Sequence, residues 1–164
     1  MIRRARPQDA AALAGVQLRA WWHAYGEYVD HELLAEHTVA SRTERWQEIL
    51  AAGQTATLVA EAGGRLAGFV SVGAPMHAPP DPGLGELHAI YVDPPAQGAG
   101  VGTRLLAAGE DELRAQGYGR ALLCVFVRNE LARAFYERHG WAPEDPPVVL
   151  DDRWSPELRY RRAL

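Results

Sequence analysis

The sequence predicts a mixed α/β fold in which helices cover both faces of a central mixed sheet. Two strand-like segments joined by Gly63-Gly64 predict a hairpin in the first half of the chain. From residue 84 onwards, apolar runs of strand length alternate with segments of helical periodicity, which predicts βα units. The 164 residues, 48% of them hydrophobic, predict one domain, residues 1–164, with a substantial core.

The first third of the chain predicts one short strand and two helices. Residues 1–6 form the strand. A helix then runs from Pro7 to about His23, because proline suits the first helical turn and Asp9 suits its positive end. Residues 39–52 predict a second helix, which ends at the capping residue Gly53.

The segment between these helices is dense in aromatic and ionisable side chains. Trp22, Tyr25 and Tyr28 are candidates for lining an apolar or cationic substrate pocket. Core packing beneath a long loop explains them equally well. His31 and His37 lie beside acidic residues, but their spacing matches no known metal-binding pattern, which favours a solvated helix face.

The remaining elements follow from apolar periodicity and from the glycines and prolines that interrupt it. The loop at residues 73–83 contains four prolines. Helices are predicted at residues 100–116 and 130–139, each ending before a glycine. The predicted strands are residues 55–62, 65–72, 87–92, 120–127, 148–150 and 157–162.

A glycine-rich loop, Gln97-Gly98-Ala99-Gly100-Val101-Gly102, joins a predicted strand to a predicted helix. Glycines allow backbone N–H groups to approach a ligand, and the first N–H groups of a helix favour an anion. The loop therefore predicts a pyrophosphate-binding site. It fits neither the dinucleotide-binding fingerprint nor the Walker loop, and a plain turn before a helix is the alternative.

Composition excludes several classes of protein. A net charge of −4 argues against a nucleic-acid binder that works by bulk charge. The single cysteine, Cys124, excludes a disulfide scaffold and a cysteine-based metal site, and its apolar neighbours predict a buried strand residue. No apolar stretch has the length of a membrane span, and no apolar signal core follows Met1, so a cytoplasmic protein is expected.

Two motifs together carry a resemblance to a known family. The loop at residues 97–102 matches the pattern Gln/Arg-x-x-Gly-x-Gly/Ala. Asn129 follows the next predicted strand, Tyr136 stands seven residues later on a helix, and Gly140-Trp141 comes after it. With these motifs, essentially the whole chain resembles the GNAT superfamily of N-acetyltransferases.

The resemblance implies both a fold and a co-substrate. The fold is a mostly antiparallel sheet of six to seven strands that splays between the fourth and fifth, where acetyl-CoA binds without a metal. By this resemblance, a strand edge pairs with the pantetheine arm of acetyl-CoA through Ile90, Tyr91 and Val92. A loop binds the pyrophosphate through Gln97, Gly98, Ala99, Gly100, Val101, Gly102 and Thr103. The side-chain amide of Asn129 also binds the cofactor arm.

The resemblance also implies the chemistry. Glu86, at the head of its strand, would act as the general base, often through water, although an ordinary strand-end carboxylate is the alternative. Tyr136 would protonate the leaving thiolate. His88 is expected on the face of Glu86, where it could relay the proton, bind substrate or simply pack. Trp22, Tyr25 and Tyr28 would contact the acceptor.

The expected activity is acetyl transfer to a primary amine by direct attack in a ternary complex. Acidic residues between 27 and 36 favour a small cationic amine as acceptor, although a solvated helix face explains these residues equally well. A protein N-terminus or lysine is one alternative, and a non-catalytic acyl-CoA sensor is another. Neither nucleic acid nor membrane is an expected partner. Members of the family are often dimers, so a homodimer is one expected state.

Overall fold

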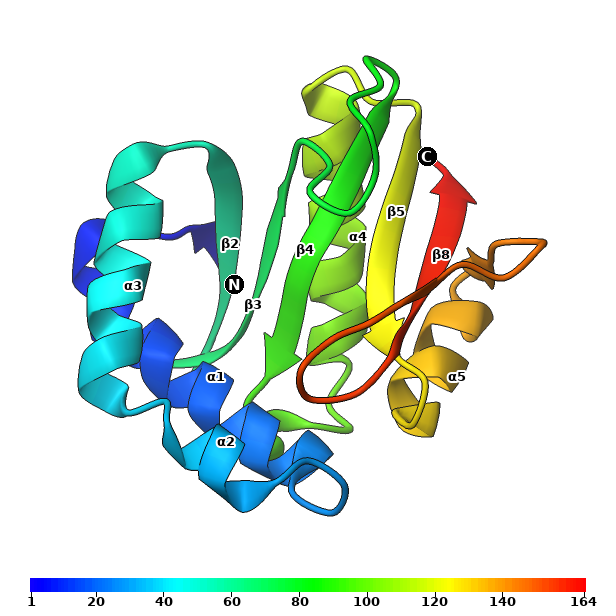
Figure 1. Cartoon of the computed structure of the whole chain (residues 1–164). Coiled ribbons are helices and arrows are strands. Elements are labelled where there is room, and N and C mark those ends of the chain that lie inside the picture. The colour runs from blue at the N-terminus through cyan, green and yellow to red at the C-terminus, as the bar shows by residue number, and fades with distance from the viewer.

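An eight-stranded sheet with the order β1-β2-β3-β4-β5-β8-β6 runs through the computed structural model, which describes residues 1–164 (Figure 1). The seventh strand, β7, pairs with β8 beside this path. Every pairing is antiparallel except that of β4 with β5. The strands are β1 Ile2–Arg4, β2 Thr55–Ala62, β3 Arg65–Gly73, β4 Leu84–Val92, β5 Arg120–Phe126, β6 Ala142–Pro143, β7 Val149–Leu150 and β8 Glu157–Ala163.

The predicted mixed sheet is therefore confirmed, with eight strands instead of the expected six or seven. The additional strand is β6, which contains two residues and pairs only with β8, whereas β7 corresponds to the predicted strand at residues 148–150. The β2–β3 hairpin forms around Gly63 and Gly64, both of which have positive φ as such turns require.

Helices cover both faces of the sheet. They are α1 Ala10–Tyr25, α2 His31–Ala35, α3 Val39–Ala52, α4 Val101–Ala115 and α5 Glu130–Arg138, with short 3-10 turns at Pro7–Asp9 and Pro94–Ala96. Helices α4 and α5 pack on the larger core through Leu105 and Tyr136. Helices α1 and α3 pack on the other face, where Leu13 and Trp46 meet Phe69 of β3. No helix has the length and apolar character needed to cross a membrane.

The two central strands separate soon after they begin. Parallel pairing joins Leu84, Gly85 and Glu86 to β5, and β4 then continues to Val92 without a further β5 partner. Gly85 allows close packing at this joint, because a Cβ there would lie 2.7 Å from the side chain of Leu113 in α4. The predicted splay between the fourth and fifth strands is confirmed (Figure 1).

A β-bulge interrupts β4 at His88. Ser71 of β3 pairs with Ala89 and the next residue, Val72, pairs with Leu87, which leaves His88 as the extra residue. The expectation that His88 shares the face of Glu86 depended on regular alternation, and the bulge breaks that alternation. His88 instead bonds through Nε2 to the carbonyl oxygen of Ala74, at 2.8 Å.

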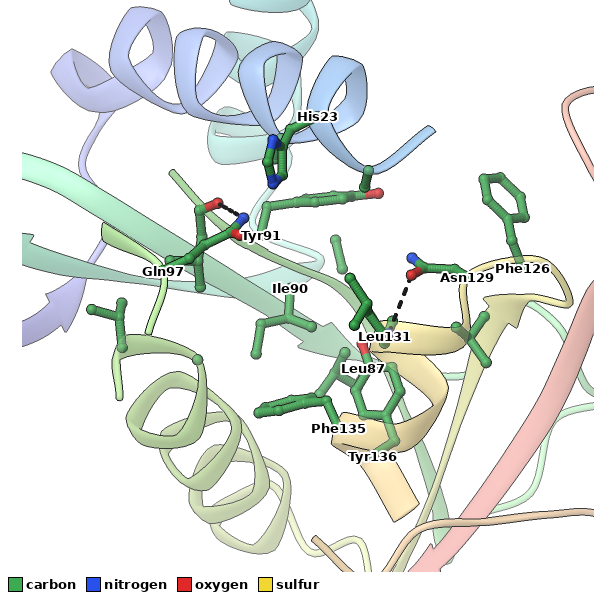
Figure 2. A pocket seen from close by; sticks show the side chains of 18 of the residues that line it. His23, Leu87, Ile90, Tyr91, Gln97, Phe126, Asn129, Leu131, Phe135 and Tyr136 are labelled. Atoms are coloured by element: carbon green, nitrogen blue, oxygen red, sulfur yellow. Dashed lines mark hydrogen bonds between the residues drawn. The ribbon is translucent and has the colours of Figure 1, made fainter. Parts of the chain in front are cut away.

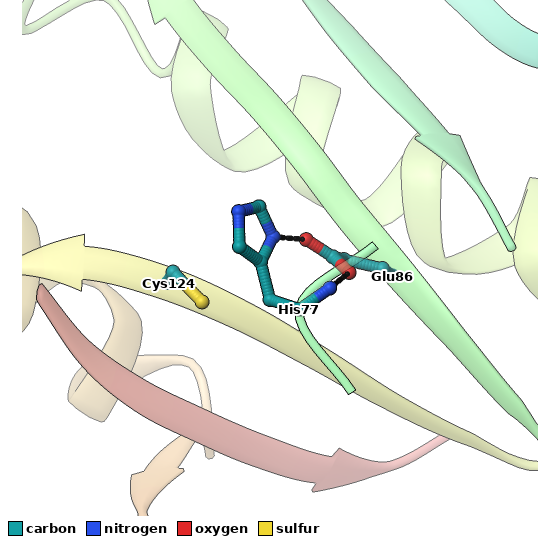
Figure 3. Close-up of side chains that lie close together, drawn as sticks. All are labelled: His77, Glu86 and Cys124. Atoms are coloured by element: carbon teal, nitrogen blue, oxygen red, sulfur yellow. Dashed lines mark hydrogen bonds and ion pairs between the residues drawn. The ribbon is translucent and has the colours of Figure 1, made fainter. Parts of the chain in front are cut away.

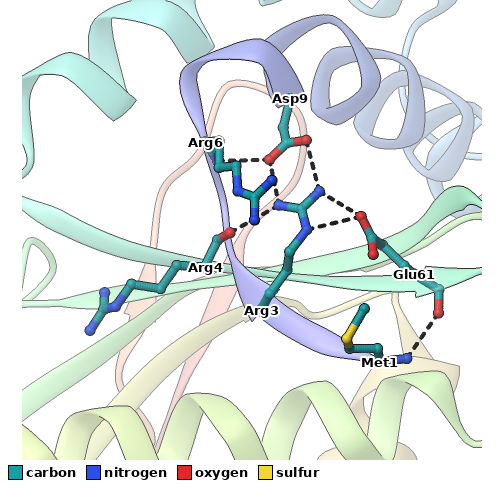
Figure 4. A network of polar contacts seen from close by, with 6 residues as sticks. All are labelled: Met1, Arg3, Arg4, Arg6, Asp9 and Glu61. Carbon is teal, nitrogen blue, oxygen red and sulfur yellow. Dashed lines mark hydrogen bonds and ion pairs between the residues drawn. The ribbon is translucent and has the colours of Figure 1, made fainter.

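A salt-bridge network fixes the start of α1 to the sheet edge (Figure 4). The Arg3 guanidinium donates to Asp9 at 2.7 Å and to Glu61 of β2 at 2.6 Å. Asp9 also accepts from the backbone N–H of Arg6 at 2.7 Å. Because Asp9 immediately precedes α1, this network orients the helix whose far end reaches the cavity described below.

Candidate functional site

A cavity of about 600 Å³ lies where β4 and β5 have separated. Residues from α1, β4, the glycine-rich loop, β5, α5 and the start of β8 line it (Figure 2). Ten of the residues predicted to bind the cofactor are among them: Ile90, Tyr91, Val92, Gln97, Gly98, Gly100, Val101, Gly102, Thr103 and Asn129. The eleventh, Ala99, does not line the cavity, and its carbonyl oxygen accepts a hydrogen bond from Arg104 at 3.2 Å.

The glycine-rich loop leads into α4 with the geometry of an anion site. Gly98 and Gly100 have φ of 79° and 73°, in the left-handed region that favours glycine. The first N–H groups of α4, at Val101 and the two residues after it, have no intrahelical acceptor. The Gln97 amide ties the loop to the end of β4 by donating to the Val92 carbonyl oxygen at 3.3 Å (Figure 2). These N–H groups and the helix dipole can hold a phosphate.

The edge of β4 that faces β5 offers a second binding element. Ile90, Tyr91 and Val92 pair with β3 on one side and have no strand partner on the other. The Val92 carbonyl oxygen accepts from Gln97, but no strand pairs with the other backbone groups on this edge, so an extended ligand arm can add to the sheet there.

Asn129 and Tyr136 reach the cavity from the β5–α5 unit. The Asn129 side chain caps α5 by accepting from the Ala132 N–H at 3.2 Å, which leaves its amide N–H groups available to a ligand (Figure 2). The Tyr136 hydroxyl makes no hydrogen bond to the protein, and burial raises the pKa of Tyr136 well above its usual value. It is therefore protonated at neutral pH and can donate a hydrogen bond.

The four predicted acceptor-contacting residues divide into two pairs. Tyr25 and His88 line the cavity. Trp22 does not: it is 42% exposed and its side chain packs on the ring of His31. Tyr28 also lies outside the lining, where its ring packs on Phe126. The side chains of Trp22 and Tyr28 therefore pack on other aromatic rings and do not line the cavity.

A smaller cavity of about 230 Å³ adjoins the first. The two share Tyr25, Tyr91 and Phe126, so an aromatic partition separates them. The segment before β8 closes the outer side: Trp154 packs at 4.8 Å from the ring of Trp21, and Asp152 contributes a carboxylate. Arg153 also lines this cavity, but its guanidinium pairs with Glu36 at 2.6 Å, so the Asp152 carboxylate and the aromatic rings can hold a compact ligand with a cationic group.

Glu86 is buried behind the cavity and is not part of its lining. Its Oε2 accepts from the backbone N–H groups of Met76 at 2.6 Å and His77 at 3.0 Å, and its Oε1 bonds to Nδ1 of His77 (Figure 3). Burial favours a higher pKa for the Glu86 carboxyl, but these hydrogen bonds outweigh it and hold the pKa below its usual value. Both carboxylate oxygens of Glu86 are thus engaged in hydrogen bonds with the protein.

His77, Glu86 and Cys124 also form a potential metal-ligand group, because their ligand atoms lie within 4.8 Å of one another (Figure 3). The cysteine count had excluded a cysteine-based metal site and did not anticipate this mixed cluster. Burial raises the pKa of the Cys124 thiol to about 12, and Glu86 is already bonded to N–H donors. A metal would have to displace those bonds and deprotonate the thiol.

Sequence reasoning missed Glu157, the first residue of β8. It contributes the only carboxylate to the larger cavity. The group is half-buried and accepts no hydrogen bond from the protein, and burial raises its pKa to about 7. The strand pattern of residues 157–162 gave no signal, because the cavity depends on the distant separation of β4 from β5.

A family model described as "Acetyltransferase (GNAT) family" matches residues 16–141. The chain belongs to the GNAT family. Curated relatives named mycothiol acetyltransferase include those of Sanguibacter keddieii, 39% identical over 85% of this chain, and Nocardia farcinica, 33% identical over 88%. This GNAT chain covers 42% and 46% of those two proteins, and thus less than half of their length.

Solved structures agree on the GNAT fold. PaiA N-acetyltransferase from Thermoplasma acidophilum, in complex with coenzyme A, superposes with a TM-score of 0.82 at 20% identity, covering 100% of this chain and 98% of that one. A putative GNAT acetyltransferase from Desulfovibrio desulfuricans gives 0.73 at 25% identity, covering 99% and 98%. The family resemblance drawn from residues 97–102, Asn129 and Tyr136 is therefore confirmed, as is the fold that it implied.

Proposed function

We propose that residues 1–164 form an N-acetyltransferase domain that moves the acetyl group of acetyl-CoA to a primary amine by direct attack in a ternary complex. One observation carries the proposal: the cavity between β4 and β5 combines an anion site, a free strand edge and a neutral tyrosine hydroxyl. Membership of the GNAT family supports it, as do curated relatives named as acetyltransferases. A structural neighbour solved with coenzyme A supports the choice of co-substrate.

The co-substrate contacts follow the cavity wall. The pyrophosphate binds the N–H groups of residues 97–103, and Arg138, the only arginine in the lining, adds positive charge nearby. The pantetheine arm pairs with the free edge at Ile90, Tyr91 and Val92, and the Asn129 amide donates to it. These contacts need no metal.

Two groups act directly on the reacting atoms in this proposal. A backbone N–H of β4 near Val92 polarises the thioester carbonyl, and the Tyr136 hydroxyl protonates the departing thiolate sulfur. The sequence prediction assigns the role of general base to Glu86. Because its oxygens are bonded to Met76 and His77, a proton could reach it only through the His77 imidazole or through water.

The acceptor in this proposal is a small cationic amine. Asp152 in the smaller cavity and Glu157 in the larger one provide negative charge beside aromatic side chains. The name of the curated relatives, mycothiol acetyltransferase, supports a small molecule over a protein as acceptor. A cytoplasmic location belongs to the same proposal.

The test is turnover of acetyl-CoA by the purified chain with a panel of polyamines, amino acids, amino sugars and a peptide N-terminus. We expect thiol release that depends on one class of small amine, with the acetylated amine found by mass spectrometry. CoA binding without thiol release from any acceptor would contradict the proposal and favour an acyl-CoA sensor.

A further inference from the structure

We propose that Glu157 is a catalytic residue: its carboxylate takes the proton from the acceptor's ammonium group so that the amine can attack. This assignment rests on the proposed acetyl transfer and adds a residue at the acceptor side of the same cleft. It differs from the sequence prediction, which gave this role to Glu86.

The position of Glu157 is the first argument. It pairs with Phe126, the last residue of β5, where β5 has no β4 partner. Phe126 lines both cavities, so the carboxylate lies on the side of the larger cavity that adjoins the smaller one. An amine bound in the larger cavity would meet this carboxylate alone, because the lining contains no other.

The second argument is that the Glu157 carboxylate is free to react. No donor of the protein bonds to it, whereas Glu86 accepts two backbone N–H groups and the His77 side chain. A base must have an oxygen available to the proton it takes. Glu157 meets this condition in the folded chain without any rearrangement.

The surrounding charges keep Glu157 a usable base near neutral pH. Burial raises its pKa most, Asp152 and Glu86 raise it further, and His77 lowers it, with the result near 7. A general base works best with a pKa close to the operating pH. The titratable groups that face Glu157 come from four elements: Asp152 before β8, His77 in the β3–β4 loop, Glu86 and Tyr91 in β4, and Cys124 in β5.

The step is balanced in atoms and protons. The ammonium nitrogen gives one proton to Glu157, which later returns it to solvent. The neutral amine then forms the C–N bond to the acetyl carbon, and the C–S bond breaks. The thiolate sulfur takes a proton from the Tyr136 hydroxyl, and the second proton lost by nitrogen restores the tyrosine.

The test compares two probe amines, methylamine, which is cationic near pH 7, and hydroxylamine, which is largely neutral. Thiol release from acetyl-CoA is followed for wild type, Glu157→Gln and the control Glu48→Gln, whose side chain is exposed on α3. Glu157→Gln should slow the methylamine reaction by roughly 100-fold and the hydroxylamine reaction far less, with CoA affinity unchanged. With methylamine as acceptor, kcat/KM of wild type should rise as the pH passes about 7. This rise should disappear in Glu157→Gln.

Equal losses for the two amines, or a pH limb that survives in Glu157→Gln, would overturn the assignment and indicate a binding or structural role. If the wild-type chain released no thiol with any amine while still binding CoA, acetyl transfer itself would fail and the base with it. The two failures are distinguishable, because one appears only in the variant and the other already in wild type.

Discussion

The imidazole of His77 bonds through Nδ1 to the buried carboxylate of Glu86, at the last residue of β4 that pairs with β5. The same carboxylate accepts the backbone N–H groups of Met76 and His77, and the His77 carbonyl oxygen accepts from Arg159 of β8 at 2.9 Å. This cluster therefore fastens the proline-rich β3–β4 loop across the point where the sheet opens.

The His77–Glu86 contact should make stability depend on pH. The hydrogen bond to Glu86 raises the pKa of His77 above its ordinary 6.5, so the stabilisation is present below 6.5 and is lost as pH rises through the raised value. For Glu86, whose pKa is lowered, stabilisation is present above 4.5 and is lost on acidification. The contact is thus strongest between these limits.

We expect urea unfolding of wild type to show lower stability near pH 8 than near pH 6, and His77→Gln to reduce this difference. His23→Gln is the matched control, because His23 is exposed and has no carboxylate partner. An unchanged difference in His77→Gln would contradict the assignment of the pH dependence to this contact.

Gly100→Asp should abolish tight CoA binding. The substitution places a carboxylate beside the proposed pyrophosphate site, and like charges in contact cost several kcal/mol, so we expect a loss on the order of 100-fold or more by calorimetry. Gly53→Asp is the control: Gly53 has a similar φ of 64° and open space around it, but lies outside the cavity. Equal CoA affinities in the two variants would remove the anion site from residues 97–103.

Tyr136→Phe should lower kcat by roughly 10- to 100-fold and leave the KM for acetyl-CoA nearly unchanged, because the hydroxyl acts only when sulfur leaves. The ring and its packing on Phe135 and Trp141 remain. Tyr118→Phe removes a hydroxyl outside the cavity and is the control. Steady-state kinetics would contradict the role of Tyr136 as acid if kcat stayed at the wild-type value.

Glu157→Gln should stabilise the fold at alkaline pH. The folded chain holds the pKa of Glu157 near 7, above the ordinary 4.5, so the ionised group destabilises the fold as pH rises through this window. Allowing for solvent screening, we expect Glu157→Gln to gain about 1 to 2 kcal/mol near pH 8 and nothing near pH 4. If the stabilities of wild type and variant changed in parallel with pH, the pKa of Glu157 would not be raised in the free protein.

The sequence predicted the parts of the site that depend on local order. Glycines before a helix, Asn129 at the start of α5 and Tyr136 two turns later are local features, and the structure brings all of them to one cavity. The hairpin at Gly63-Gly64 and the ends of most helices were predictable for the same reason.

What the sequence did not predict depends on distant contacts. The bulge at His88 arises from the register of β4 against β3, which no alternation pattern records. Glu157 enters the cavity only because β8 pairs with β5 beyond the point where β4 has left it. Trp22 was predicted to contact the acceptor because of its residue type. Its position around the axis of α1 places its ring against His31 instead.

In the proposed reaction an amine attacks acetyl-CoA directly while both are held between β4 and β5. Cys124 lines the cavity, but burial raises the pKa of its thiol to about 12, which makes it a poor nucleophile for an acetyl-enzyme. Initial rates with both substrates varied test the claim most directly. Direct attack predicts intersecting double-reciprocal lines and, without acceptor, no acetylated protein by intact-mass measurement. Parallel lines with acetyl-Cys124, or no turnover with any amine, would contradict it.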